Sequence, residues 1–258
     1  MRKTIVFLSI LAMMLGCASS FKSQRAQSKP MVSIAMEKIS RDDLQGALVE
    51  LRKAIDANPS DPEAYYALSV AYWKMDKLDK ALESIEKAID NADKLELEHP
   101  GMESESYNLK GSILMSKGMY EDAIAAFQRA VKDDLYSTPE YAYYNLAAAY
   151  MEMKNLDLAL DSSKKSLEKN PHYAPAWKIL AWVYVQQGND DKAIEALKHA
   201  VAEFNGYTDA YWDLAQIYIR RGQFKEAREN LNEVINLDPN GTYGTLAEEK
   251  IQEMNTRR

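Results

Sequence analysis

The sequence contains little of what enzymes and disulfide-rich proteins use. Its single cysteine, Cys17, excludes an internal disulfide, and ten glycines and eight prolines in 258 residues argue against a loop-rich or all-β chain. Of the three histidines, His99, His172 and His199, no two are four residues apart, and no phosphate-binding loop, nucleophile elbow or paired-carboxylate motif occurs. We therefore predict no catalytic residue, no metal, no cofactor and no small-molecule substrate.

Basic charge is also scarce. The chain has 32 lysines and arginines against 39 aspartates and glutamates, a net charge of −7. Residues 1–16 carry Arg2 and Lys3 and no acid, so without them 30 basic residues face 39 acidic ones, a net charge of −9. Because neutralised phosphates supply most of the affinity for nucleic acid, this balance argues against a nucleic-acid partner.

The longest apolar run lies at the N-terminus. Arg2 and Lys3 precede a mostly apolar stretch over 5–15, which is the layout of a secretory signal peptide and is too short for a membrane span of roughly 20 residues. Residues 18–30 are rich in Ser, Gln, Lys and Arg with no apolar period, which predicts a flexible tether.

The sequence Met14-Leu15-Gly16-Cys17 resembles the lipobox of bacterial lipoproteins, although leucine is usual where Met14 stands. The resemblance implies cleavage after residue 16 and lipids, palmitate among them, on Cys17. Several acyl chains would hold the protein firmly at a membrane. Ala18, in place of aspartate, implies the outer membrane, facing the periplasm. The alternative is a plain secretory signal in which the cysteine is incidental.

Two blocks recur along residues 28–241. The first block has an aromatic residue, a leucine three further on, a small residue next and an aromatic three beyond, as in Tyr65, Leu68, Ser69 and Tyr72. The second is built on alanines 47, 81, 123, 159, 193 and 227, with spacings of 34, 42, 36, 34 and 34. Both blocks have helical spacing and no unit could bury its apolar face alone, so neighbouring units must stack.

This pattern resembles the tetratricopeptide repeat, whose period is 34. The resemblance implies an all-α fold, a right-handed α-solenoid of six helical hairpins spanning 31–258. The expected repeats are 28–61, 62–95, 104–137, 140–173, 174–207 and 208–241, with a C-terminal capping helix over 242–258. An insertion of eight residues falls near 96–103 and one of two near 138–139.

In this architecture the residue after each packing aromatic, and those four and seven further on, face a concave groove. Exposed apolar and aromatic residues at such positions indicate a protein-binding surface. The predicted groove residues are Val32, Met36, Ile39, Tyr66, Val70, Trp73, Asn108, Met115, Tyr144, Met151, Trp182 and Trp212. We expect an apolar or amphipathic partner segment; alternatively, the groove closes on itself or holds the chain's own tether.

Six repeats behind a lipid anchor resemble the pilotin lipoproteins of type IV pili, the PilF, PilW and Tgl type. The extended loop from Asp134 to Glu140 and the residues Asn145 to Tyr150 also fit that family; the insertion near His99 does not. The resemblance implies an outer-membrane protein that binds secretin subunits and promotes their assembly. The alternatives are an envelope scaffold for peptidoglycan-modifying or division proteins and, third, an enzyme or an export chaperone.

Overall fold

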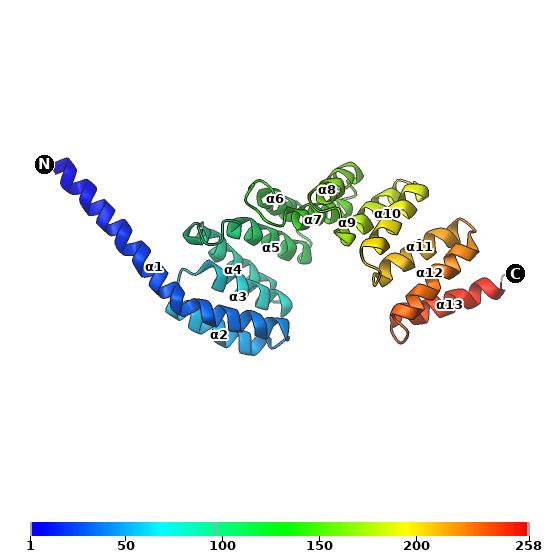
Figure 1. Ribbon diagram of the computed structural model, residues 1–258, viewed down its shortest axis with the longest axis horizontal. Coiled ribbons are helices and arrows are strands. Elements are labelled where there is room, and N and C mark those ends of the chain that lie inside the picture. The colour runs from blue at the N-terminus through cyan, green and yellow to red at the C-terminus, as the bar shows by residue number, and fades with distance from the viewer. Residues whose placement is uncertain (1, 96, 257–258) are drawn as a thin grey trace. The chain divides into compact units, whose positions relative to one another are not determined.

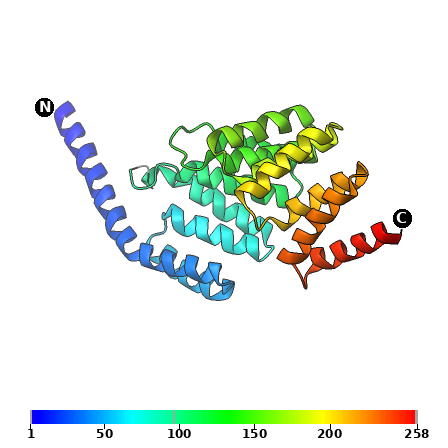
Figure 2. The ribbon, with the colours of Figure 1, turned by 45° about the vertical axis from the view of Figure 1, so that its right-hand side comes forward.

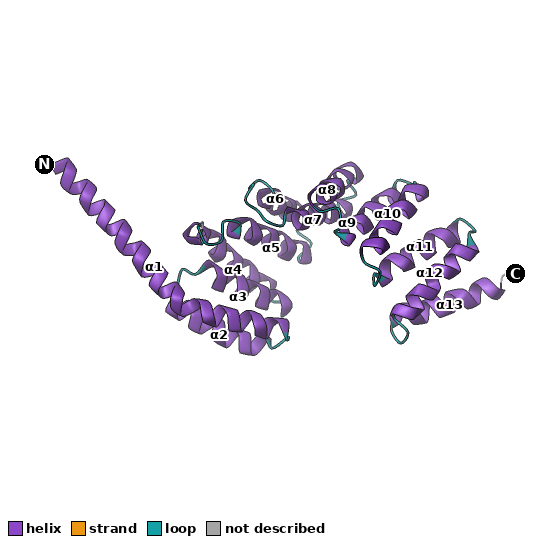
Figure 3. Ribbon diagram, viewed as in Figure 1, coloured by secondary structure: helices purple, strands orange, loops and turns teal. Residues whose placement is uncertain are grey.

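The computed structural model describes the backbone of residues 2–95 and 97–256, and the side chains of residues 21–95 and 97–256. Within these residues the chain forms thirteen α-helices, one short 3-10 helix and no strand (Figures 1 and 3). They are α1 (Arg2–Ser40), α2 (Leu44–Ala57), α3 (Pro62–Lys74), α4 (Leu78–Asp90), η1 (Ala92–Leu95), α5 (Met102–Ser116), α6 (Tyr120–Ala130), α7 (Pro139–Glu152), α8 (Leu156–Lys169), α9 (Ala174–Gln186), α10 (Asp190–Glu203), α11 (Thr208–Arg220), α12 (Phe224–Leu237) and α13 (Thr242–Thr256).

Helices α1 to α12 pair in chain order into six hairpins, and α13 packs against α11 and α12. The predicted fold, an all-α stack of six hairpins with a capping helix, is confirmed. No helix within the described residues is both long and apolar enough to cross a membrane.

One left-handed residue lies between the two helices of every hairpin. Glycine supplies it in three hairpins, and aspartate or lysine in the other three. These residues are Asp42, Asp76, Gly118, Lys154, Gly188 and Gly222, with φ between 56° and 73°. The amide after each donates to a carbonyl five residues back, as from Lys77 to Tyr72. This is the Schellman ending of a helix, and it turns the chain back at the same place in each repeat.

The hairpins form two compact units, Met1–Ser137 and Thr138–Arg258. The core of the first unit contains Leu51, Ile85 and Phe127, all fully buried. The core of the second is one continuous cluster, in which Leu197 and Leu231 are fully buried. Each unit therefore has its own hydrophobic core, built by alternating first and second helices.

The N-terminal segment differs from the prediction. Residues 21–30 are part of the continuous helix α1 (Figure 2), and Arg25 and Ser28 are buried in the first unit. The prediction of a flexible tether is therefore wrong for residues 21–30, because specific contacts hold this segment on the hairpin stack. Cys17 lies within α1, but its side chain is outside the described residues and its lipidation stays a prediction.

Arg25 is the centre of these contacts. Its guanidinium lies 3.4 Å from Asp61, 3.1 Å from Glu63 and 2.9 Å from Glu98, while Ser28 donates a hydrogen bond to Asp61. Burial alone would lower the pKa of Arg25, but its hydrogen bonds to Glu63 and Glu98 raise that pKa above its ordinary value. The buried arginine is therefore held charged and joins α1 to both α3 and the inserted segment.

The inserted residues complete this attachment. Helix η1 (Ala92–Leu95) and the start of α5 place Leu95 and Met102 in a small apolar cluster, against which Phe21 of α1 packs. Leu95 and Met102 are almost inaccessible to solvent. The insertion that breaks the repeat period thus holds the N-terminal helix through these contacts. We call Arg25, Glu98 and the Phe21–Leu95–Met102 cluster the N-terminal clasp.

Candidate functional site: pockets between the first helices

In the first unit, the predicted groove positions border a pocket of about 360 Å³. Val32 and Met36 reach it from α1 and Tyr66 reaches it from α3, so three of the predicted residues lie together. The remaining lining residues come from α1, α3, the insertion and α5: Lys29, Ser33, Glu63, His99, Met102 and Glu105. We call this the α1–α3 pocket.

The polar wall of the α1–α3 pocket centres on His99. Its Nδ1 lies 3.4 Å from Glu63 and its Nε2 lies 3.0 Å from Glu105. Tyr66 also lines this pocket, and its pKa is raised to about 12, mainly by burial and next by the charge of Glu105. The tyrosine therefore stays neutral at physiological pH and offers a ring face, while the carboxylates and Lys29 form a polar rim.

The second unit has a pocket of about 200 Å³ at matching repeat positions. Tyr144 and Met151 border it from α7 and Trp182 borders it from α9, so three more predicted residues lie together. The remaining lining residues are Ala148, Glu152, Pro175, Lys178, Ile179 and Tyr207. We call this the α7–α9 pocket, and most of its lining is apolar or aromatic.

Trp182 is the exposed aromatic of this pocket, with 49 % of its surface accessible. Its indole N–H donates to Asp213 at 2.7 Å, and the ammonium of Lys178 lies 5.5 Å from the centre of its ring. Lys178 also pairs with Asp209 at 3.0 Å. Burial raises the pKa of Asp213 above its ordinary value. A fixed, solvent-facing indole of this kind is the usual anchor of a protein interface.

Two predicted groove residues belong to the core. Val32 and Ile39 are only 6 % and 4 % exposed and pack with Ala64 and Ala67 of α3, so their assignment to an open groove is wrong, although Val32 also borders the α1–α3 pocket. The reason is that this face of α1 packs on α3. A first-helix position that faces the groove also faces the next first helix.

The other predicted residues lie outside both pockets. Val70 and Trp73 are half-buried against the core formed by α4 and α5, and the Trp73 indole donates to Ser116 at 2.9 Å. Trp212 packs on the core of the second unit, with its ring 5.8 Å from that of Tyr243 in the capping helix. Asn108 and Met115 are half-buried on α5.

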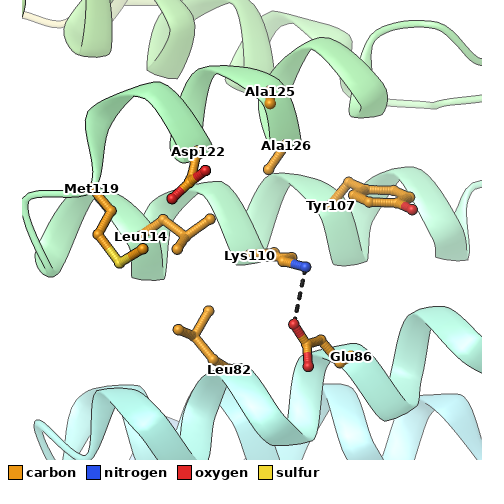
Figure 4. Close-up of a pocket in the computed structure, with 9 residues that line it drawn as sticks. All are labelled: Leu82, Glu86, Tyr107, Lys110, Leu114, Met119, Asp122, Ala125 and Ala126. Carbon is orange, nitrogen blue, oxygen red and sulfur yellow. Dashed lines mark hydrogen bonds and ion pairs between the residues drawn. The ribbon is translucent and has the colours of Figure 1, made fainter.

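A third pocket, of about 450 Å³, lies between α4, α5 and α6 and was not predicted (Figure 4). An ion pair of 3.1 Å between Lys110 and Glu86 crosses it. The signal for it is present in the sequence, because Lys110 stands at a position that leucine occupies in four other first helices. We call this the α4–α6 pocket.

Comparison with protein families shows which type of repeat the hairpins are. Models described as tetratricopeptide repeat match residues 62–94 and 104–132, 140–202 and 191–248, and a model described as TPR repeat matches 37–76. The hairpins are tetratricopeptide repeats. Repeats of this type serve as scaffolds that bind other proteins, which agrees with the apolar and aromatic side chains that line the α7–α9 pocket.

Among relatives, the type IV pilus assembly protein PilF of Pseudomonas aeruginosa is 25 % identical over 177 residues, which are 66 % of this chain and 67 % of that protein. A repeat-containing protein of Methanocaldococcus jannaschii is 32 % identical over 130 residues, half of this chain. The chain spans only 21 % of the length of that archaeal relative.

Two solved structures have the same fold. The structure of Pseudomonas aeruginosa PilF aligns with a TM-score of 0.73 at 18 % identity, covering 91 % of this chain and 99 % of that one. The crystal structure of PilW, a type IV pilus biogenesis factor, aligns with a TM-score of 0.73 at 23 % identity, covering 85 % and 97 %. These structural similarities concern the fold alone.

Proposed function

We propose that this protein acts in type IV pilus assembly as a lipid-anchored outer-membrane protein, a pilotin that binds secretin subunits in its α1–α3 and α7–α9 pockets. The observation that carries the proposal is the relationship to PilF, which extends over two thirds of each sequence and is accompanied by a common fold over nearly all of both chains. A protein that assembles other subunits needs binding surfaces rather than catalytic groups, and the pockets provide such surfaces.

The two pockets favour an apolar partner segment. Met36 and Trp182 are each more than 40 % exposed, and each borders a pocket with other apolar side chains in its lining, Val32 and Met102 beside Met36 and Ile179 beside Trp182. Exposed anchors beside preformed pockets recognise helical or extended segments that carry apolar residues at regular spacing. Polar groups at the rims, such as Glu152 and Lys29, would set the register of that segment.

The lipid on Cys17 completes the proposal. Anchoring this protein and the secretin subunits to one membrane raises their effective concentration without any new contact. Between the anchor and the hairpins, the N-terminal clasp holds α1 from Phe21 onward. The anchor is therefore separated from the α1–α3 pocket by a short segment, which keeps that pocket near the membrane surface.

Site-specific photocrosslinking in living cells tests this proposal. A benzophenone amino acid replaces Trp182 or Met36 in the pockets, or Val49 as a control that is 54 % exposed on the second helix α2. We expect a secretin subunit crosslinked at Trp182 and Met36 and not at Val49. Crosslinking of peptidoglycan-modifying enzymes in place of secretin would contradict the proposal.

A further inference from the structure

The third hairpin lacks a leucine that four other hairpins carry in their first helix. The first helices α3, α7, α9 and α11 carry leucine at matching positions, namely Leu68, Leu146, Leu180 and Leu214. The last three of these are at most 5 % exposed. At the matching position of α5 stands Lys110, which cannot leave its charge in a hydrophobic core without a partner.

The side chain of Lys110 reaches toward α4. Its ammonium donates to Glu86 at 3.1 Å, as the dashed line in Figure 4 shows. Beside Lys110 lies the α4–α6 pocket, with a volume of about 450 Å³. Its lining consists of Leu82, Glu86, Tyr107, Lys110, Leu114, Met119, Asp122, Ala125 and Ala126. This lining is apolar at one end and carries the ion pair at the other.

The charges of the α4–α6 pocket do not balance. Lys110 neutralises Glu86, but Asp122 forms no ion pair with any residue that the structure describes. In Figure 4 the carboxylate of Asp122 is directed from α6 toward Leu114, at the apolar end of the pocket. Met119, which also lines the apolar end, is 40 % exposed. A carboxylate without a counter-ion beside an open apolar surface favours a ligand that is both apolar and cationic.

We propose that the α4–α6 pocket is a second protein-binding site, which takes a partner segment with a leucine-sized apolar side chain and a neighbouring lysine or arginine. The apolar side chain packs between Leu82 and Leu114, and the cation pairs with Asp122. Burial of the apolar group supplies the affinity, and the ion pair fixes the register of the segment. No lining residue of this site is shared with the other pockets, so the proposal does not depend on secretin binding.

The chain offers variants that test this site without harming the fold. Lys110→Leu introduces the residue that four other repeats carry, and we expect it to fill the apolar part of the pocket and to raise the melting temperature. Asp122→Asn removes the unpaired charge. Glu121→Gln is the matched control, because Glu121 is an exposed acid in the same first turn of α6 and does not line the pocket.

The probe is a fluorescein-labelled, alanine-based helical peptide with one leucine and an arginine four residues later, titrated with the full chain and followed by anisotropy. We expect saturable binding that Asp122→Asn weakens about tenfold, that Lys110→Leu abolishes, and that Glu121→Gln leaves unchanged. A peptide with glutamate in place of arginine should not bind. Absence of binding to the native chain would overturn the proposal, as would equal effects of Asp122→Asn and Glu121→Gln or undiminished binding to Lys110→Leu.

Discussion

Gly111 and Phe127 face each other in the third hairpin. Gly111 is smaller, and Phe127 is larger, than the residues at the matching positions of the other hairpins. Gly111 stands where Ser69, Ala147, Ala181 and Ala215 stand in other first helices. Phe127 is fully buried where leucine, isoleucine or serine occupies the other second helices. A Cβ atom on Gly111 would lie 2.6 Å from Cδ1 of the Phe127 ring. The smallest residue on α5 therefore makes room for the largest on α6.

Gly111→Ala is predicted to destabilise the protein by about 1–3 kcal/mol through overpacking, although alanine favours a helix over glycine by about 1 kcal/mol. Phe127→Leu in the same chain should restore most of the loss, because leucine occupies the matching positions 197 and 231. Urea denaturation of the two single variants and the double variant measures this coupling. A stabilising Gly111→Ala would contradict the packing described here.

Asp213 gives a prediction about pH. Burial raises its pKa in the folded state, so the ionised carboxylate costs stability above that pKa, and the cost disappears as the pH falls through it. Asp213→Asn keeps an acceptor for the Trp182 indole and removes the charge. We expect the variant to be at least as stable as the native protein at pH 7, with the difference shrinking toward pH 4. Denaturation midpoints at both pH values decide this, and a variant less stable at pH 7 would contradict it.

Residue positions that the repeat fixes could be predicted from the sequence. The matched sizes of two contacting side chains could not. The first block of the repeat places leucine at positions 146, 180 and 214, and all three are buried. It also indicated that Tyr144, Met151 and Trp182 face a common surface, where they line one pocket. The fit of Gly111 to Phe127 depends on a distance between helices, and no spacing in the sequence contains that distance.

At the scale of elements, α1 and the insertion depend on each other. Arg25 is 4 % exposed and Asp61 is inaccessible, so the ion pair between them is buried. Asp61 also accepts a hydrogen bond from the amide of Glu63 as the N-cap of α3. The N-terminal clasp therefore joins three elements through one guanidinium.

Arg25→Met is predicted to destabilise the first unit by about 3–5 kcal/mol, because it leaves the buried carboxylate of Asp61 without a counter-ion. Adding Asp61→Asn should recover much of this loss, since asparagine is neutral and equally suited to an N-cap. Thermal denaturation of the native chain, both single variants and the double variant measures the effect. Additive losses would show that the two side chains act independently.

Sequence patterns did not reveal the clasp, for a physical reason. Residues 18–30 lack an apolar period because the contacts of Arg25 and Ser28 are polar, and hydrophobic periodicity responds only to apolar faces. The insertion near His99 interrupts the repeat, so the alignment of repeats carried no information about it. The N-terminal segment and the insertion stabilise each other, so predicting the structure of either one requires knowing that the two are in contact.

At the scale of the whole molecule, the hairpins form two units with separate cores. The core cluster of the second unit extends from Leu167 in α8 to Met254 in α13. Stacked repeats contact only their neighbours, so a block of hairpins with a capping helix can be stable by itself.

We therefore predict that residues 138–258 fold without the rest of the chain. Far-ultraviolet circular dichroism should show a helical fragment, and its thermal unfolding should be cooperative. Removing α13 (Thr242–Thr256) from the same fragment is the matched comparison, because it exposes the faces of α11 and α12 on which Ala247 of α13 packs. A fragment that is unstructured even with α13 would show that the second unit needs the first.

The most direct test of the proposed function is crosslinking in intact cells, followed by purification of this protein from the outer-membrane fraction and identification of what is bound to it. We predict a secretin subunit bound to the native protein, and loss of both membrane retention and secretin in a Cys17→Ala variant. Recovery of wall-modifying enzymes without any secretin would contradict the proposed role in pilus assembly.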